Sequence, residues 1–322
     1  MPIGTTGVTF GGGYNTFYHF KDNNNNNWVR LSSATPSFFQ IAASPQDSAV
    51  SSCSYCFLNG LIYEYGGFNG GALSQSNSLY SYNPMSNSWT TLAPSPSVIG
   101  TSSGGLLPCN NKIYAVTGYN NNGAGSFYSS SSSNQVFEYT PSTNTWVTKN
   151  NAPDSITAGC CVYNGVIYRV CGYDGVSPSN SCYAYYPTSD TWVQLANHPN
   201  ANGLTGLQPV AHAGKIWCPG GSDGNSGAAV NNFFVYDIAS NVWSSFAPLL
   251  APLTAYQAEL FEGRLYLVSG ITTSSNISQA IYYYQFENGT WTKDTLATPN
   301  FILQGGLNQG VVAQEPVGLG GG

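Results

Sequence analysis

The stretch Tyr82-Asn83-Pro84-Met85-Ser86-Asn87-Ser88-Trp89 decides the fold of this chain of 322 residues. Proline presets φ, and asparagine and serine side chains bond their own backbone, so the residues between the two aromatics predict a tight hairpin between two strands. The spacing of tyrosine and tryptophan recurs at intervals of roughly 50 residues, which is typical of a blade-type repeat array. The pairs are Tyr82 and Trp89, Tyr139 and Trp146, Tyr185 and Trp192, Tyr236 and Trp243, and Tyr284 and Trp291, and a sixth tryptophan, Trp28, precedes them.

A short apolar run that ends in glycine precedes each hairpin, and Ile62-Tyr63-Glu64-Tyr65-Gly66-Gly67 is the clearest copy. Such runs are rich in aromatic and β-branched residues and are bounded by glycine, which favours strand over helix. A further strand is expected before each run, for example at 53–58 and 256–261, so each repeat predicts four strands. The other copies of the run are 113–118, 167–172, 216–221 and 265–270, with a shorter first copy at 8–12.

Together, the run ending in Gly-Gly and the Tyr-x-Pro-x-(Thr/Ser)-x-x-Trp hairpin resemble the kelch repeat over essentially the whole chain. The resemblance implies an all-β fold, namely a six-bladed β-propeller with one four-stranded blade for each repeat. Kelch repeats usually carry an arginine at the start of the innermost strand, whereas these places hold Ser, Gly, Ala or Leu here. The implied blades are residues 1–31 with 304–317, 48–93, 102–149, 156–195, 205–246 and 254–295.

The first repeat has too few residues before 8–12 to hold an innermost strand, so we expect the C-terminal tail to supply it. Residues 307–314 follow Trp291 at the distance where the other repeats place an inner strand. We therefore expect Gly310-Val311-Val312-Ala313 to complete the blade that begins with residues 8–28. This pairing would protect the open sheet edges and make the whole chain one domain.

The composition is poor in charge and excludes some partners. Only 7% of the residues are charged, against roughly 25% in ordinary domains, and 8 Lys and Arg against 14 Asp and Glu give a net charge of −6. With so few lysines and arginines, electrostatic binding to the phosphate backbone of a nucleic acid is not expected. No apolar run approaches the roughly 20 residues of a membrane span, and residues 1–4 show no signal-peptide pattern.

The cysteines and two glycosylation sequons favour an extracellular or cell-surface location. An even count of eight cysteines in a charge-poor chain favours an oxidising compartment. Cys171 and Cys182 lie on strands expected to fold back on each other, so we expect a disulfide between them; the alternative is that the cysteines act as small buried hydrophobes. The sequons at Asn276 and Asn288 fall in expected turns, where a glycan could be accommodated.

Candidate chemical groups are few. His19, His198 and His212 occupy different places in their repeats, so we expect no metal site and no cofactor. Glu64 and Arg169 are charges within apolar strands, and they either form a polar site in the central channel or take part in local pairs. Asp174-Gly175 and Asp223-Gly224 are expected to form turns rather than a calcium site.

One face of the expected propeller carries the longer loops. These are the loops within 68–77, 119–134, 173–181 and 222–232 and the long connection from Trp28 to Ile62, while 23–27 and 129–133 are expected to be flexible loop tips. Aromatic side chains beside Asn, Ser and Asp suit sugar rings or protein surfaces, although they could equally pack as plugs between loops. The expected binding-face residues are Phe38, Phe39, Phe68, Asn69, Tyr119, Asn120, Tyr173, Asp174 and Asp223.

These observations favour a non-catalytic interaction module that is extracellular or on the cell surface. It would bind a protein or a carbohydrate through the long-loop face, or assemble with copies of itself. The alternative is a sugar-modifying enzyme of the mutarotase or lyase type, with Glu64 and Arg169 as catalytic residues. A second alternative is a cytosolic kelch adaptor of the ubiquitin-ligase type.

Overall fold

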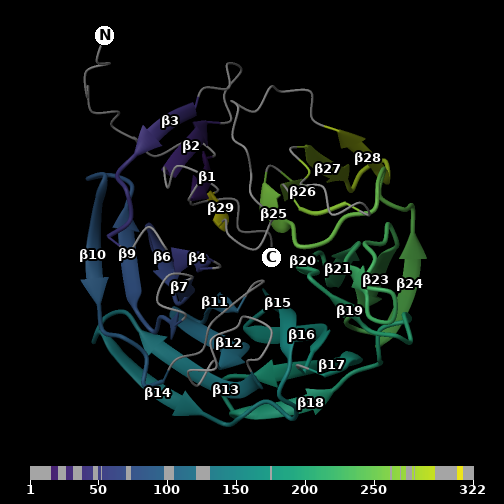
Figure 1. The fold of residues 1–322 in the computed structure, drawn as a ribbon, viewed down its shortest axis with the longest axis horizontal. Coiled ribbons are helices and arrows are strands. Elements are labelled where there is room, and N and C mark those ends of the chain that lie inside the picture. The colour runs from purple at the N-terminus through teal and green to yellow at the C-terminus, as the bar shows by residue number, and fades with distance from the viewer. Residues whose placement is uncertain are drawn as a thin grey trace.

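Every regular element in the described part of the computed structural model is a β-strand, and the strands form sheets arranged around a central axis (Figure 1). The protein is an all-β propeller. Among the described residues, none belongs to a helix long and apolar enough to cross a membrane. The structure describes residues 16–20, 27–31, 38–45, 50–51, 53–69, 74–97, 105–120, 131–174, 176–261, 263–268, 270–272, 278, 280–293 and 310–314.

Five four-stranded antiparallel sheets repeat one plan, in which the chain runs from an innermost strand through two middle strands to an outer strand that carries the tryptophan. They are β5 (Ser54–Leu58), β6 (Leu61–Tyr65), β9 (Leu79–Asn83) and β10 (Ser88–Leu92); β11 (Leu106–Cys109), β12 (Lys112–Asn120), β13 (Ser131–Thr140) and β14 (Thr145–Lys149); β15 (Thr157–Tyr163), β16 (Val166–Tyr173), β17 (Pro178–Tyr186) and β18 (Thr191–Gln194); β20 (Val210–His212), β21 (Lys215–Pro219), β23 (Phe233–Asp237) and β24 (Val242–Phe246); and β25 (Gln257–Phe261), β26 (Arg264–Val268), β27 (Ile281–Gln285) and β28 (Thr290–Lys293).

A further four-stranded sheet joins the two ends of the described chain. Its order is β29 (Gly310–Gln314), β1 (Thr16–Phe20), β2 (Asn27–Leu31) and β3 (Phe38–Ile41). β29 pairs antiparallel with β1, with Tyr18 opposite Val312. The innermost strands contact one another in a closed series that runs β5, β11, β15, β20, β25, β29 and back to β5.

This sheet corrects the expected place of Trp28. The implied first blade, residues 1–31 with 304–317, makes the strand of Trp28 its last strand, but Trp28 lies on β2, and the outer strand is β3. The six equivalent repeats implied by six tryptophans are therefore five, because the outer strand of this sheet carries no tryptophan. The expected strand at 8–12 lies outside the described residues. The expected end of the first blade at residue 31 is also too early, since β3 extends the sheet to Ile41.

Hydrogen bonds from each tyrosine–tryptophan hairpin hold neighbouring sheets together. The indole Nε1 of Trp89 donates to the backbone O of Ala42, which directly follows the outer strand of the preceding sheet, at 3.0 Å. Asn87 Oδ1 accepts from Ala42 N and from the Tyr82 hydroxyl, both at 2.8 Å. The same three bonds recur at Tyr139, Asn144 and Trp146; at Tyr185, Asp190 and Trp192; and at Tyr236, Asn241 and Trp243.

The hairpin asparagine has a second role, because its backbone is left-handed. Its φ is 48° at Asn87 and 56° at Asn241, a region that asparagine tolerates better than most residues. In the last hairpin Gly289 takes this place, with φ of 69°, and the Trp291 indole still donates to Ala247 O at 3.2 Å. The hairpin asparagine therefore both allows the tight turn and links neighbouring blades.

We expect Asn241→Gly to lower the free energy of unfolding by about 1–2 kcal/mol, because it keeps the left-handed turn but removes the acceptor of the Tyr236 hydroxyl and of Ala196 N. Asn241→Ala should cost about 1 kcal/mol more, since alanine is strained at positive φ. Denaturant titration of both variants would measure the difference. Equal stability of the two variants would contradict the assigned backbone role.

The hydrophobic core lies between neighbouring sheets. Tyr65 and Leu79 of one sheet pack with Ile113 and Phe137 of the next, and all four are buried. Equivalent clusters join each later pair of sheets. Burying each such side chain contributes about 1.5–3 kcal/mol, so the packing between sheets holds the ring rigid.

The long loops contain more strand than the sequence predicted. β12 and β13 pair as far as Asn120 opposite Ser131, so residues 131–133 of the serine run belong to a strand rather than a flexible tip. β16 and β17 likewise pair out to Tyr173 opposite Pro178. Two small sheets lie among these loops: β4 (Val50–Ser51), β7 (Phe68–Asn69) and β8 (Ser74–Gln75), and β19 (Leu204–Thr205) with β22 (Ser222–Asp223).

Candidate functional sites: the arm rim and the central channel

The loops of two adjacent blades form a continuous structure on the long-loop face. We call it the arm rim and define it as the described residues of 173–181, 198–207 and 222–230. Its first part is the β16–β17 hairpin, which is closed by Asp174. The Asp174 carboxylate accepts hydrogen bonds from Val176 N at 2.7 Å and Ser177 N at 2.5 Å, and these bonds hold the pKa of the carboxyl below its usual range.

Asp223 joins the other two parts of the arm rim. Its Oδ2 accepts from the side-chain amides of Asn200 and Asn202, each at 3.1 Å, across the boundary between the two blades. Its Oδ1 accepts from the backbone of Asn225 and Ser226. These bonds, first among them the one from Asn202, hold the pKa of Asp223 well below its usual range. One carboxylate therefore fixes both loops.

Close backbone approach completes the arm rim at two glycines. A Cβ on Gly203, whose φ is 72°, would lie 2.6 Å from the carbonyl carbon of Ser179. A Cβ on Gly224 would clash with the ring of Pro178 and with the backbone O of Asn202. The hairpin of one blade thus rests directly on the loops beside it, and the rim is organised in advance of any partner.

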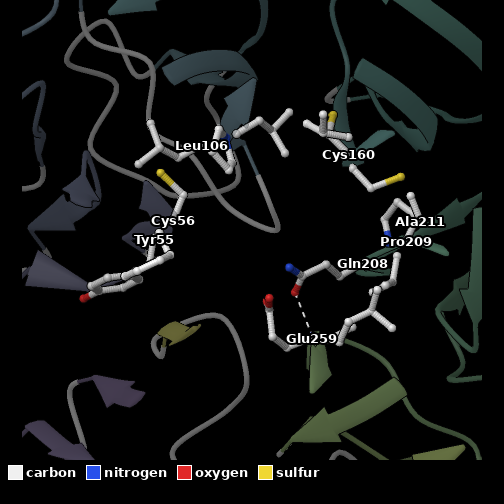
Figure 2. Close-up of a pocket in the computed structure, with 16 residues that line it drawn as sticks. Tyr55, Cys56, Leu106, Cys160, Gln208, Pro209, Ala211 and Glu259 are labelled. Atoms are coloured by element: carbon white, nitrogen blue, oxygen red, sulfur yellow. Dashed lines mark hydrogen bonds between the residues drawn. The ribbon is translucent and has the colours of Figure 1, made fainter. Parts of the chain in front are cut away.

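The central channel is the second candidate site. The innermost strands β5, β11, β15, β20 and β25 surround a cavity of about 310 Å³ (Figure 2). Its wall is mostly apolar, and Glu259 carries the single charge among the described residues that line it. The side chains of Gln208 and Glu259 extend into the cavity, while the ring of Tyr55 points away from it (Figure 2). Gln208 Oε1 accepts from Ala258 N at 3.0 Å, which fixes the amide.

Comparison with known proteins agrees with this architecture. The family model described as the kelch motif matches residues 49–96, 101–152, 157–199 and 205–250, which is more than half of the chain. The protein belongs to the kelch-repeat family. The chain is 25% identical to Kelch-like protein 35 of Mus musculus over 233 residues, which are 72% of this chain but only 29% of that protein. The solved structure of YjhT covers 87% of this chain and 94% of its own, with a TM-score of 0.73 and 15% identity, and shows the fold alone.

The kelch fold places only some of the predicted binding-face residues in the arm rim. Tyr173, Asp174 and Asp223 lie in the arm rim, although both carboxylates are engaged in its turns. The prediction of Phe38 and Phe39 on a long loop is wrong, because they lie on β3 and pair with β2. The remaining predicted residues lie on strands near other loops: Phe68 and Asn69 in β7 and Tyr119 and Asn120 at the end of β12.

Glu64 and Arg169 do not form a channel site. Neither lines the described cavity, and both are fully buried. Arg169 forms an ion pair with Asp154 and lies over the ring of Tyr183, 4.7 Å from its centroid. Glu64 lies against Tyr55; burial, with the adjacent carboxylate, raises the pKa of that tyrosine well above its usual value. An ion pair therefore accounts for the charge of Arg169, while the described contact of Glu64 is with Tyr55.

The predicted disulfide between Cys171 and Cys182 does not form in this structure, where both residues are thiols, as are the other six cysteines. Cys171 sits at a β-bulge with φ of 53°, and the residue opposite Cys182 is Val170. The two thiols are nevertheless hydrogen-bonded to each other. All eight thiols are buried, as the alternative of small hydrophobic cysteines predicted.

The histidines and sequons fall in separate places. His198 is buried against Phe234 and Trp243, and its Nδ1 accepts from Asn200 N at 3.2 Å. His212 stacks on Phe286. No group of three or more potential ligands that could hold a metal occurs in the part of the chain that is described.

Of the two sequon asparagines, Asn288 is exposed in the β27–β28 turn, while Asn276 lies outside the described residues.

Proposed function

We propose that this kelch propeller is a non-catalytic interaction module that binds a protein partner through the arm rim. The observation that carries the proposal is the bonding of Asp223 to Asn200 and Asn202, which fixes two blades' loops as one surface. Preorganised loops lose little conformational entropy on binding, which favours affinity.

The chemistry of the arm rim favours a protein over a sugar. Val176 is 84% exposed at the tip of the β16–β17 hairpin and offers an apolar contact. Around it, Asn202, Asn225 and Ser226 are exposed and offer hydrogen-bond donors and acceptors. Tyr173, the aromatic residue of the rim predicted to stack on a ligand, is half-buried at the base of the hairpin. Sugar rings usually stack on open aromatic faces, which this described rim does not offer.

The proposal is tested by capture of partners from an extract of cells that make the protein, with three immobilised forms. Val176→Asp places a charge on the rim, and Val147→Asp is the matched control, because Val147 is 51% exposed on the outer strand β14. We expect the parent and Val147→Asp to retain the same partner and Val176→Asp to lose it. Equal retention by all three forms, or retention by none, would contradict the proposal.

We also propose that the sheet of β29, β1, β2 and β3 serves as a sixth blade and closes the ring. Two observations support this. β29 contacts both β25 and β5, the innermost strands on either side. Ala42, at the end of β3, bonds with Asn87 and Trp89 as the ends of other outer strands bond with the next blade. A protein lacking 310–314 should then lose cooperative unfolding, and unchanged unfolding would contradict the closure.

An extracellular or cell-surface location remains a proposal, supported by the low charge and by the exposed sequon at Asn288. Eight buried thiols favour instead the second candidate, an intracellular kelch adaptor. Mass spectrometry of the natural protein separates the two, because a glycan on Asn288 requires passage through the secretory route.

A further inference from the structure

The central channel carries a charge that the repeat does not require. Glu259 lies on β25, three residues before the turn that joins β25 to β26. Counted from the same turn, the other four described blades place Cys56, Leu107, Cys161 and Val210 at this position. All four are buried and apolar. Packing of the blades therefore accepts an apolar side chain here, and among the described blades the carboxylate is particular to this one.

The charge of the described channel wall is negative. No lysine or arginine is among the described residues that line the cavity, and the sequence of β29, Gly-Val-Val-Ala-Gln, adds none. Burial and then the charge of Glu259 raise the pKa of the Cys56 thiol, so the cavity disfavours a further negative charge. A carboxylate between apolar walls produces a negative potential that attracts cations.

Gln208 adds a hydrogen-bond donor beside this carboxylate. Its carbonyl is held by Ala258 N, and its amide nitrogen extends into the cavity on the same side as Glu259 (Figure 2). The aliphatic side chains of Leu106 and Leu260 form part of the remaining wall. A volume of about 310 Å³ lies at the lower end of the range for small-molecule sites, and an apolar wall with few converging polar groups is typical of them.

We propose that the central channel binds a small organic ammonium ion, whose nitrogen contacts the Glu259 carboxylate and whose carbon chain lies against the apolar wall. The Gln208 amide can donate to an oxygen next to the ammonium group. This site is separate from the arm rim, so its occupancy does not depend on the protein partner proposed for that surface.

Three probes of similar size test the site on the parent protein by ligand-observed NMR titration. They are propylammonium, 1-propanol and propionate, which differ in charge but share a three-carbon chain. We expect propylammonium to bind about tenfold or more tightly than 1-propanol, because a hydrogen bond to a charged group is worth more than a neutral one, and propionate not to bind. Equal binding of the three probes, tighter binding of propionate, or binding of none would overturn the proposal.

Two variants locate the binding. Glu259→Gln should weaken propylammonium binding by about tenfold or more while keeping side-chain volume. Glu287→Gln is the matched control, since Glu287 is exposed in the β27–β28 turn, and it should bind as the parent does. Unchanged binding in Glu259→Gln, or the same loss in both variants, would overturn the assignment. If Glu259→Gln does not fold, the three-probe comparison on the parent protein decides alone.

Discussion

Asp154→Ala is expected to lower the free energy of unfolding by about 3 kcal/mol, the lower end of the cost of breaking a buried ion pair, because Arg169 is fully buried while Asp154 is 34% exposed. Arg169 is fully buried, and its Nη1 bonds both the carboxylate and the backbone O of Asp154. Asp154 also accepts from the Ser181 hydroxyl at 3.1 Å. Alanine would leave the guanidinium in the core with the rings of Tyr183 and Trp192 beside it but no counter-charge.

Denaturant titration of two further proteins shows whether the uncompensated charge is the cause. In Asp154→Ala/Arg169→Leu both charges are gone, so most of the lost stability should return. Asp174→Ala removes an exposed turn carboxylate and should cost about 1 kcal/mol. A loss for Asp154→Ala as small as that for Asp174→Ala would contradict the importance of the pair.

The contribution of His198 to stability is expected to fall by about 3 kcal/mol as the pH falls from 6.5 to 4. Burial holds the pKa of His198 at about 4, below its ordinary value of 6.5. The folded protein keeps the ring neutral, while the unfolded chain binds a proton below pH 6.5, so acid favours unfolding. Each pH unit between the two pKa values corresponds to about 1.4 kcal/mol. Above pH 6.5 both states are neutral and the contribution is constant.

His198→Leu provides the matched comparison. In the next blade Leu249 takes the equivalent place: its backbone N bonds Asn231 O, as His198 N bonds Asn180 O. The difference in unfolding free energy between parent and variant, measured from pH 7 to 4, cancels the titration of the other groups. We expect this difference to shift in favour of the variant as the pH falls. Parallel pH profiles would contradict the burial of a neutral histidine.

The repeated part of the fold could be predicted because it is local. Each tyrosine–tryptophan hairpin lies within eight residues, and its turn chemistry is visible at Asn87 and Asn241. Trp28 was misplaced because the outer strand of its sheet, Phe38–Ile41, carries no tryptophan to mark it. The β-bulge at Cys171 could not be predicted either, because nothing in the surrounding sequence indicates it.

The candidate sites were harder to predict because they are made between repeats. Turn chemistry correctly explained the bonds of Asp174 and the bonds that Asp223 accepts from Asn225 and Ser226. The bonds of Asp223 to Asn200 and Asn202, however, span more than 20 residues. In an Asn-rich chain no local signal singles out those two side chains. Glu259 had a detectable signal, since it is a carboxylate at a position that holds Cys or aliphatic residues in the other described blades. Only the ring of inner strands shows that this position faces the channel.

Hydrogen exchange of the propeller, alone and bound to the partner captured from the extract, tests the central claim most directly. We expect amides of 173–181, 198–207 and 222–230 to gain protection together on binding, because Asp223, Gly203 and Gly224 join these segments into one surface. Protection confined to the opposite face, at the hairpin turns Asn110–Asn111 and Asn164–Gly165, with the arm rim unchanged, would contradict the account.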